Sequence, residues 1–459
     1  MIGDYNVNFG QGLVVGGRAM GSKGGGAAAI RRFPTMLRAV APMNESTNLR
    51  GAAAVLGNAY FSGTIFYGHR SFDGELGTDS LGEICFEGSL SNTGCHRTTS
   101  EIANRQNLWM HVYGAHFQMK RRIFEIGITG VGTYFSRWVS EKAELYRKYG
   151  FAGRQVGNVG IDYKVILHKT ILFGEAGMSF LPDRTGWGML HGVIVDPDPR
   201  CKLSALLRYY DRNYVALQAF AFSSGSSCND ELGLYLAADF VTGRRTSLSV
   251  HADGYKYSWL KYQVDSPAEG FDVGTKFTVQ ASRNLQFSLK YQYYYLAENQ
   301  RFNEYFQSVA YVGRHKGRVA VDCTPTAWLQ LRTEGDLVVN DQARGAPRTG
   351  LLLYQDVALH IERWHFGAKL RLAFFDTDSY AERIYAYEQD LLNSFTIASY
   401  YGKGVRYYLM LNYKYAFFDI QVRFSQTYYD DRTTIGSSQA QINGRTKSDL
   451  RVQLNFHIH

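Results

Sequence analysis

Hydrophobic and polar residues alternate strictly at the C-terminal end of the chain. Within Arg451–His459 every second residue is apolar: Val452, Leu454, Phe456 and Ile458. The residues between them are Arg, Gln, Asn and His. Side chains of a strand point alternately to its two faces, so this period of two predicts a β-strand with one apolar and one polar face.

The same alternation recurs at Ser247–His251, Leu285–Lys290, Lys369–Leu372 and Ile420–Ser425. In each segment the polar face carries a charged residue or an imidazole. A globular core does not need a charged face on strand after strand. A membrane barrel does, because its apolar face meets lipid and its polar face lines a wet interior.

Turn residues such as Gly57-Asn58, Arg283-Asn284 and Asp196-Pro197-Asp198-Pro199 separate these segments. Most segments between turns have about 8–14 residues, which suits a tilted membrane crossing and exceeds the usual length in globular sheets. The pattern therefore predicts an all-β fold: one large antiparallel transmembrane β-barrel over residues 1–459, with about 22 strands (about 20–24). The predicted strands include Asp4–Val15, Tyr214–Ser223 and Glu382–Phe395.

Long connections are expected at Gly16–Leu49, His69–Gln106, Arg137–Gly153 and Asp430–Lys447. In outer-membrane barrels long loops face outside and short turns face the periplasm. Between about Asp211 and Asp376 this alternation slips by one, which indicates a miscounted strand or long periplasmic loops.

Composition agrees with strands rather than membrane helices. Mean hydropathy is −0.26, and no apolar run approaches the ~18–20 residues of a membrane helix. The 33 Tyr, 28 Phe and 47 Gly against 8 Pro favour strands and turns. Many Tyr residues, as in Tyr293-Tyr294-Tyr295, lie near predicted strand ends, where interfacial aromatic girdles form. Met1-Ile2-Gly3-Asp4 lacks the features of a signal peptide, so we expect a fragment.

The net charge of +9 allows two interpretations. It can attract polyanions such as lipopolysaccharide or nucleic acid. It can also reflect Arg and Lys spread over turns and a polar interior. The second is favoured, because Lys120-Arg121-Arg122 is the only dense basic block.

Five cysteines leave one without a partner. Cys85 and Cys95 lie in one loop and are candidates for a local disulfide. Cys201 and Cys228 are a second candidate pair, which leaves Cys323 alone. No CxxC or Cys/His metal spacing is present, so no metal or cofactor is expected.

Candidate chemistry is sparse. Gly24-Gly25-Gly26 before Arg31-Arg32 resembles a phosphate loop but lacks GxxxxGK[ST], and a flexible loop over or into the barrel is the better interpretation. His96-Arg97 with Glu101 offers a base and an orienting carboxylate without a nucleophile. Enzymatic activity is therefore not expected.

Other charged residues suit a barrel interior. Glu175 is expected to point into the lumen. In Arg383–Asp390, Arg383, Tyr385 and Tyr387 share one face of a strand, while Glu388 and Asp390 share the other. The two carboxylates therefore do not pair with Arg383.

The order of several short motifs resembles the barrel region of Bacteroidota outer-membrane proteins with helix-hairpin-helix domains. The motifs are Gly3-Asp4-Tyr5 with Phe9-Gly10-Gln11-Gly12-Leu13, Arg50-Gly51-Ala52-Ala53-Ala54, His96-Arg97-Thr98 with Ser100-Glu101-Ile102, Phe173-Gly174-Glu175, Asp230-Glu231-Leu232-Gly233-Leu234-Tyr235, Trp259-Leu260-Lys261-Tyr262 with Ser266-Pro267, and Arg383-Ile384-Tyr385-Ala386-Tyr387-Glu388.

The resemblance implies an outer-membrane location, with a signal peptide and helix-hairpin-helix repeats that precede the barrel in the family and are missing here. It also marks Arg50, His96, Arg97, Glu101, Glu175, Glu231, Arg383 and Glu388 as family-motif residues. A DNA-binding role of such repeats does not transfer to these residues.

Taken together, the sequence predicts an integral outer-membrane barrel that acts as a porin-like pore, a transport component or a membrane scaffold. Its expected partners are outer-membrane lipid and lipopolysaccharide. One alternative is a DNA-binding or uptake component acting through the missing N-terminal region. The other, a barrel-embedded hydrolase, lacks a motif.

Overall fold

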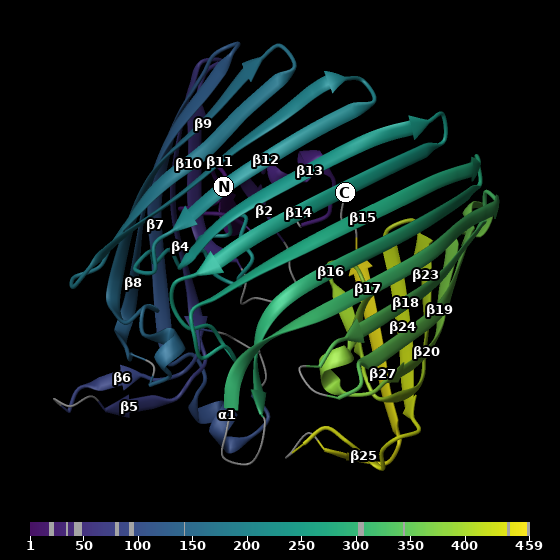
Figure 1. Ribbon diagram of the computed structural model, residues 1–459. Helices are drawn as coiled ribbons and strands as arrows, with labels where there is room; N and C mark the ends of the chain where they lie inside the picture. Colours follow the sequence, from purple (N-terminus) through teal and green to yellow (C-terminus); the bar gives the residue numbers. More distant parts are fainter. Residues whose placement is uncertain are drawn as a thin grey trace. The chain divides into compact units, whose positions relative to one another are not determined.

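The computed structural model describes residues 1–17, 23–33, 35–40, 48–78, 82–90, 96–141, 143–301, 307–342, 345–437 and 441–456. Its secondary structure is almost entirely antiparallel strand, with 23 strands in one sheet (Figure 1). The predicted fold class, a large antiparallel β-barrel of about 22 strands, is confirmed in class and in strand number. Among the described residues, no helix is long and apolar enough to cross a membrane.

The chain divides into two compact units. Unit 1 comprises Met1–Asp239, Val250–Phe271 and Ala297–Val309. Unit 2 comprises Phe240–Ser249, Asp272–Leu296 and Ala310–His459. Five strands contribute residues to both: β13 (Glu231–Gly243), β14 (Thr246–Tyr257), β15 (Ala268–Ser282), β16 (Leu285–Arg301) and β17 (Gln307–Thr326).

In unit 1, consecutive long strands pair antiparallel with their neighbours. They are β1 (Ile2–Asn8), β3 (Leu49–Gly57), β4 (Phe61–Phe72), β7 (Leu108–Lys120), β8 (Phe124–Val139), β9 (Gly153–Leu167), β10 (Thr170–Phe180), β11 (Thr185–Asp198) and β12 (Cys201–Tyr210). Short elements lie between them: η1 (Ala27–Ile30), β2 (Met36–Ala39), β5 (Leu76–Thr78), β6 (Ile84–Phe86), α1 (Thr99–Ala103) and η3 (Leu145–Arg147).

In unit 2, the strands that follow β17 again pair in chain order. They are β18 (Leu329–Asn340), β19 (Arg348–Ile361), β20 (Phe366–Thr377), β23 (Lys403–Tyr415), β24 (Phe418–Tyr429) and β27 (Thr446–Phe456). Two small hairpins stand apart, β21 (Ile384–Glu388) with β22 (Thr396–Tyr400) and β25 (Thr434–Ile435) with β26 (Ile442–Asn443). The remaining helices are η4 (Glu362–Trp364) and η5 (Tyr380–Glu382).

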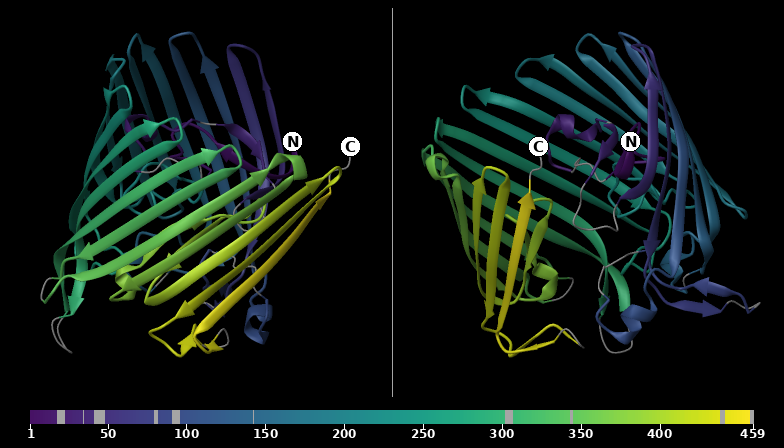
Figure 2. Two further views of the ribbon diagram at one scale, coloured as in Figure 1. Left: turned by 90° about the vertical axis from the view of Figure 1, so that its right-hand side faces the viewer. Right: turned by 180° about the vertical axis from the view of Figure 1, so that it is seen from behind.

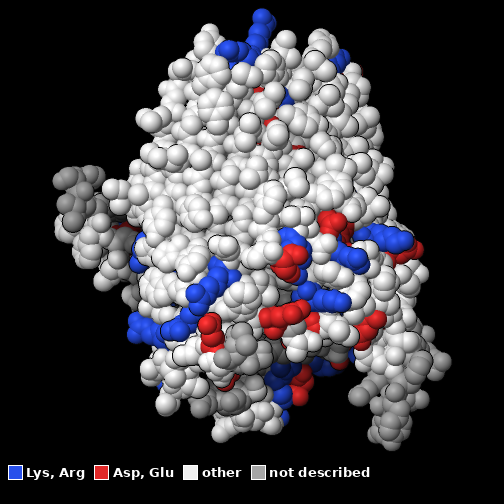
Figure 3. All heavy atoms as spheres, turned by 90° about the vertical axis from the view of Figure 1, so that its left-hand side faces the viewer, with Lys and Arg blue, Asp and Glu red and all other residues white. Residues whose placement is uncertain are grey.

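The two faces of the sheet are inverted relative to a soluble protein. Leu450 and Leu454 of β27 are 66% and 56% exposed, and Leu351 and Leu353 of β19 about half exposed. Charged side chains, Arg371 of β20 among them, are buried on the opposite face. Figure 3 shows one face with a broad zone nearly free of Lys, Arg, Asp and Glu, which gather toward its ends. The predicted apolar and polar faces of the strands are thus confirmed, with the apolar set outward.

The predicted strand Tyr214–Ser223 is wrong. Residues 211–230 connect β12 to β13 as a loop, here called the infolded loop, whose Tyr214, Val215, Ala221 and Phe222 are buried. Its mixture of apolar and polar residues reflects packing, not strand pairing. Removing this strand restores the alternation: the connections after β12, β14, β18, β20 and β24 are each longer than the turns after β13, β15, β17, β19 and β23.

Two more predicted strands are shorter than expected. In Asp4–Val15 only the first part is strand, since β1 ends at Asn8 and residues 9–17 form a turn-rich segment, here called the N-terminal loop. Glu382–Phe395 is not a membrane crossing but contains β21, one arm of a small hairpin. In the right-hand view of Figure 2, the purple coil of η1 is seen beside teal strands of the sheet.

Candidate functional site

Glu175 projects from β10 onto the buried face of unit 1, where it is 2% exposed. Its carboxylate accepts hydrogen bonds from the backbone N–H groups of Gln11 (2.6 Å), Leu13 (3.1 Å) and Val14 (3.0 Å). Successive N–H groups that converge in this way form an anion-binding nest. The sheet thus supplies the anion, and the N-terminal loop supplies the nest.

Two glycines allow the N-terminal loop to take this shape. Gly10 and Gly12 have φ of +51° and +80°, in the left-handed region that favours glycine. A Cβ on Gly10 would lie 2.6 Å from a Glu175 carboxylate oxygen, so a side chain there would displace the carboxylate. The glycines of Phe9-Gly10-Gln11-Gly12-Leu13 therefore give the backbone the shape that binds the Glu175 carboxylate.

The infolded loop closes over the N-terminal loop. The backbone N–H of Phe220 donates to the carbonyl of Gly12 (2.8 Å), and the Tyr214 hydroxyl donates to the carbonyl of Leu13 (2.9 Å). In the same unit, the Asn158 side chain of β9 donates to the carbonyl of Val215 (2.9 Å). Both loops are consequently bound to each other and to the sheet.

A second buried cluster in unit 1 is ionic. Arg208 of β12 donates to Glu231 (2.5 Å) and, through two nitrogens, to Asp253 of β14 (2.7 and 3.0 Å), and all three side chains are fully buried. Lys23 pairs with Asp253 and donates to the Ser224 hydroxyl (2.8 Å). Two cations face two carboxylates, so the charges balance. Removing any one of them would leave a buried charge uncompensated.

Unit 2 holds the β21–β22 hairpin in a related way. Glu388, at the end of β21, is fully buried. Its carboxylate accepts two hydrogen bonds from Arg406 of β23 (2.7 and 2.9 Å), one from Arg423 of β24 (2.5 Å) and one from the Tyr400 hydroxyl (2.7 Å). Here the sheet supplies the cations and the inserted hairpin supplies the anion.

Four neighbouring strands of unit 2 each contribute one arginine to this face, here called the arginine ladder: Arg371, Arg406, Arg423 and Arg451. Arg423 and Arg451 lie directly opposite each other in register, and Asp390 near the hairpin accepts from Arg451 (2.8 Å). The hairpin's two carboxylates therefore offset like charges that would otherwise repel.

Arg371 connects the ladder to the hairpin backbone. It donates two bonds of 2.6 Å to Asp356 of β19 and a third to the carbonyl of Tyr387 (2.8 Å). Its guanidinium also lies 3.8 Å from the ring centroid of Tyr354. These contacts hold the Arg371 guanidinium in one orientation, so that it fixes the position of the hairpin backbone at Tyr387.

The structure separates the sequence-predicted residues into two groups. Glu175, Glu231 and Glu388 are buried and hold inserted segments. Arg50 pairs with Asp4 (2.9 Å) between β3 and β1, with both side chains substantially exposed. Arg383 stacks on Tyr380 (4.2 Å), and Glu388 binds Arg406 and Arg423.

The interpretation of His96 and Glu101 as a base and its orienter is wrong. Glu101 accepts from the backbone N–H of Arg97 (2.7 Å) and from its guanidinium (3.0 Å). Those bonds lower the pKa of Glu101 to about 2. His96 instead meets Asp73 (3.0 Å). The motif therefore caps α1, whose Thr98 hydroxyl accepts from the N–H of Glu101 (3.1 Å).

Sequence reasoning missed most of the charged residues that bind the inserted segments. Arg208, Arg371, Arg406 and Arg423 were not singled out, although each stands on the polar face of an alternating strand. The available signal was a lone charged residue in the middle of such a strand. It is ambiguous, because lumen charge is common in barrels whether or not a segment is bound.

The cysteine predictions have different outcomes. Cys95 lies outside the described residues, so its pairing with Cys85 stays a prediction. Cys85 is buried and accepts from the Ser140 hydroxyl (3.0 Å). Cys201 and Cys228 are both free thiols, so the second candidate pair is wrong.

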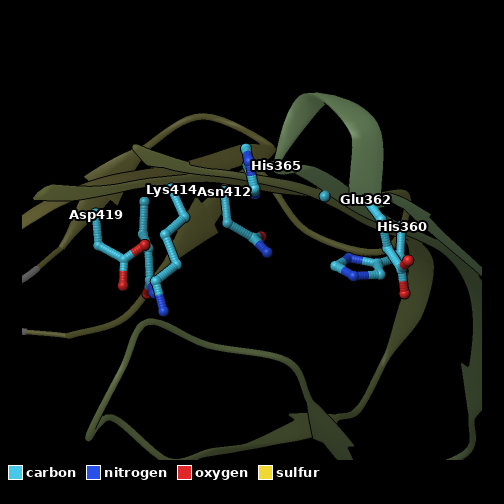
Figure 4. Close-up of a pocket in the computed structure, with 8 residues that line it drawn as sticks. His360, Glu362, His365, Asn412, Lys414 and Asp419 are labelled. Atoms are coloured by element: carbon cyan, nitrogen blue, oxygen red, sulfur yellow. The ribbon is translucent and has the colours of Figure 1, made fainter. Parts of the chain in front are cut away.

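A cavity of about 460 Å³ lies at the turns after β19 and β23 of unit 2 (Figure 4). Its lining brings together His360, Glu362, His365, Lys414 and Asp419. In the described part of the chain, no group of three or more His, Cys, Asp or Glu is arranged to hold a metal ion. Within the described residues, the ionisable side chains that line the cavity therefore do not form a metal-binding arrangement.

No family model and no curated protein matches the chain. Solved structures do. The FrpB iron transporter from Neisseria meningitidis is 9% identical over 88% of this chain and 78% of its own, with a TM-score of 0.45. The copper transporter OprC is 9% identical over 90% and 70%, with a TM-score of 0.48.

The ferric enterobactin receptor of Pseudomonas aeruginosa (a mutant form) is 7% identical over 89% of this chain and 70% of its own, with a TM-score of 0.46. At such identities and TM-scores, these likenesses carry no argument about what this chain does.

Proposed function

We propose that the chain is an integral outer-membrane β-barrel that acts as a transport component, with segments bound inside that close it at rest. The observation that carries this proposal is the inverted burial of the sheet. Leu450 and Leu454 stand exposed on the same strand whose Arg451 binds Asp390 on the other face. Water is a poor solvent for the apolar face with Leu450 and Leu454. Lipid is a poor solvent for the charged face with Arg451.

The size of the exposed apolar surface supports the location. Monomeric soluble proteins rarely expose contiguous apolar patches larger than a few hundred Å². Here strand after strand exposes Leu, Ile, Val or Phe at alternate positions, as at Leu232, Leu234 and Leu236 of β13. A hydrocarbon environment removes that penalty, and the long strands pair their backbone polar groups with neighbouring strands of the sheet.

Two sets of contacts, here called the two clamps, support a closed resting state: the bonds between Glu175 and the N-terminal loop, and the bonds between the arginine ladder and the hairpin. An open pore needs no buried contacts between its wall and inserted segments. In this chain Glu175 binds the N-terminal loop in unit 1, and the arginine ladder binds the β21–β22 hairpin in unit 2. Each contact is a small set of charge-assisted bonds that a competing ligand of like charge can replace.

The test is reconstitution of the full chain into lipid vesicles, followed by conductance measurements in planar bilayers. We expect the chain to sediment with the vesicles, to resist extraction by carbonate and to conduct little. Glu175→Ala and Glu388→Ala are expected to insert equally well and to conduct more. A chain that stays in the supernatant contradicts the location, and a large steady conductance of the unmodified protein contradicts the closed state.

The other candidate roles have less support. The DNA-binding or uptake component stays a prediction. The barrel-embedded hydrolase needs a catalytic Ser or acid pair near the membrane edge, and the sequence offers no such motif.

A further inference from the structure

The basic block Lys120-Arg121-Arg122 has no part in either clamp. It forms the turn between β7 and β8, where the N–H of Arg121 donates to the carbonyl of Phe124 (2.8 Å). Two neighbouring turns are bound to it: the N–H of Lys120 donates to the carbonyl of Tyr60, and the N–H of Ile166 to that of Ile123 (both 2.7 Å). Three neighbouring turns of unit 1, with the strand ends that they join, thus make one continuous surface.

A pocket of about 310 Å³ lies on this surface, here called the turn pocket. Four cationic side chains line it, from Lys120, Arg121, Arg122 and Lys164, against the single carboxylate of Glu125. Glu125 is bound by Lys164 (2.6 Å) and Lys120 (3.4 Å). Within the described residues, Arg121 and Arg122 form no ion pair, and both are exposed.

Aromatic and aliphatic side chains continue the turn pocket toward the apolar face. The Arg121 guanidinium lies 4.5 Å from the ring centroid of Tyr60 and 5.3 Å from that of Phe61. Phe61 in turn stacks on Phe117 of β7, with centroids 6.0 Å apart. Beyond them the exposed face carries apolar side chains on each of four neighbouring strands: Ile65, Phe117, Ile126, Ile128, Val159 and Ile161.

We infer that the turn pocket binds the phosphodiester headgroup of an anionic phospholipid, whose acyl chains lie along the adjoining apolar face. Two unpaired guanidiniums offer bidentate hydrogen bonds to phosphate oxygens. The aromatic rings lie where membrane proteins place their interfacial girdle. The inference rests on the proposed membrane function and names a partner for it.

The position of the pocket selects phospholipid over lipopolysaccharide. It lies at the short turns, which in outer-membrane barrels face the periplasm and hence the phospholipid leaflet. Other short turns of the chain carry basic residues too, at Lys169, Arg200, Arg244-Arg245 and Arg283. The turn pocket differs from these in gathering four cations around one cavity with aromatic walls.

The experiment measures binding of dihexanoyl phosphatidylglycerol and dihexanoyl phosphatidylcholine to the detergent-solubilised full chain by native mass spectrometry. The test variant is Arg121→Gln/Arg122→Gln. The matched control is Arg244→Gln/Arg245→Gln, which removes the same charge from another short turn. Inorganic phosphate is added in a separate arm as a competitor.

We expect the unmodified protein to prefer phosphatidylglycerol, and the test variant to bind it about tenfold more weakly, since two charge-assisted contacts are lost. The control variant should keep its affinity. Equal binding of the two lipids overturns the inference, and so does an equal loss in both variants. Full displacement by millimolar phosphate would assign the pocket to a free anion instead. If the chain inserts into vesicles and shows no lipid preference, only this inference fails; if it does not insert, the proposed function fails.

Discussion

Both units bind an inserted segment to the buried face of the sheet, but the charged groups come from opposite partners. In unit 1 the sheet contributes a carboxylate, Glu175, and the N-terminal loop contributes three backbone N–H groups. In unit 2 the sheet contributes guanidiniums, and the hairpin contributes the carboxylate of Glu388. Each inserted segment is held by a buried carboxylate, but on opposite sides of the contact.

Because the carboxylate comes from the sheet in unit 1 and from the hairpin in unit 2, the two inserted segments need different residues. A nest of N–H groups depends on backbone shape, so the N-terminal loop needs glycines at Gly10 and Gly12 and little from its side chains. The hairpin needs one acidic side chain at one place, and its backbone is an ordinary two-stranded ladder. The first contact is therefore sensitive to backbone changes and the second to charge changes.

Removal of the Glu388 carboxylate should have the largest effect. Glu388→Ala leaves Arg406 and Arg423 buried without their anion, which costs about 3–5 kcal/mol of stability. Unfolding of the reconstituted protein in guanidinium chloride, followed by tryptophan fluorescence and by gel mobility, would measure the loss.

Asp376→Ala is the matched control for that change. Asp376 also pairs with a cation of β23, Lys403 (3.1 Å), but both side chains are more than half exposed. Its loss should change the free energy of unfolding by less than about 1 kcal/mol. Similar losses in the two variants would mean that the buried clamp contributes no more than a surface pair.

Glu175→Ala should have the next largest effect, and a local one. It leaves three buried N–H groups without an acceptor, which weakens the closed position of the N-terminal loop by about 2–4 kcal/mol. Hydrogen exchange should accelerate for residues 10–16 and not for the β21–β22 hairpin. Faster exchange in both segments would show that the two clamps are coupled and do not act independently.

Gly10→Ala sharpens the claim about backbone shape. Its Cβ would lie 2.6 Å from the Glu175 carboxylate oxygen at a φ of +51°, so we expect a cost of about 1–3 kcal/mol in closing the N-terminal loop. Gly3→Ala is the control, because Gly3 has φ +113° but nothing within 4 Å of an added Cβ. Hydrogen exchange of residues 10–16 distinguishes the two, and equal effects would assign the cost to φ alone.

The strands were predictable because their signal is local. Alternation such as that of Arg451–His459 follows from two faces in two solvents. The structure places Val452, Leu454 and Phe456 outward as expected, and Ile458 lies outside the described residues. For the inserted segments, prediction of membrane strands from alternating residues gave a wrong result. Tyr214–Ser223 and Glu382–Phe395 pack on the buried face of the sheet, so they carry mixed apolar and polar residues without crossing a membrane.

The clamps were not predictable, because their partners lie far apart in sequence. Glu175 and Gln11 are 164 residues apart in the sequence. The residues around each of them carry no pattern that indicates the other as a partner. Only the glycines of Phe9-Gly10-Gln11-Gly12-Leu13 hinted at a special backbone. In the sequence, Arg406 and Arg423 are indistinguishable from other charged residues of a barrel lumen. Only the structure shows that both bind Glu388 of the hairpin.

The smallest expected effect concerns Arg50, a motif residue that belongs to neither clamp. Its pair with Asp4 joins β3 to β1 directly across the ladder, but the two side chains are 54% and 32% exposed. Solvent screens such a pair, so Arg50→Ala should lower the free energy of unfolding by less than about 1 kcal/mol and leave hydrogen exchange of residues 10–16 unchanged. A larger loss would place an energetic contribution on the strand that leads into the N-terminal loop. The nest around Glu175 would then depend on how β1 is anchored as well as on its own glycines, and unit 1 would resemble unit 2 in needing side-chain charge.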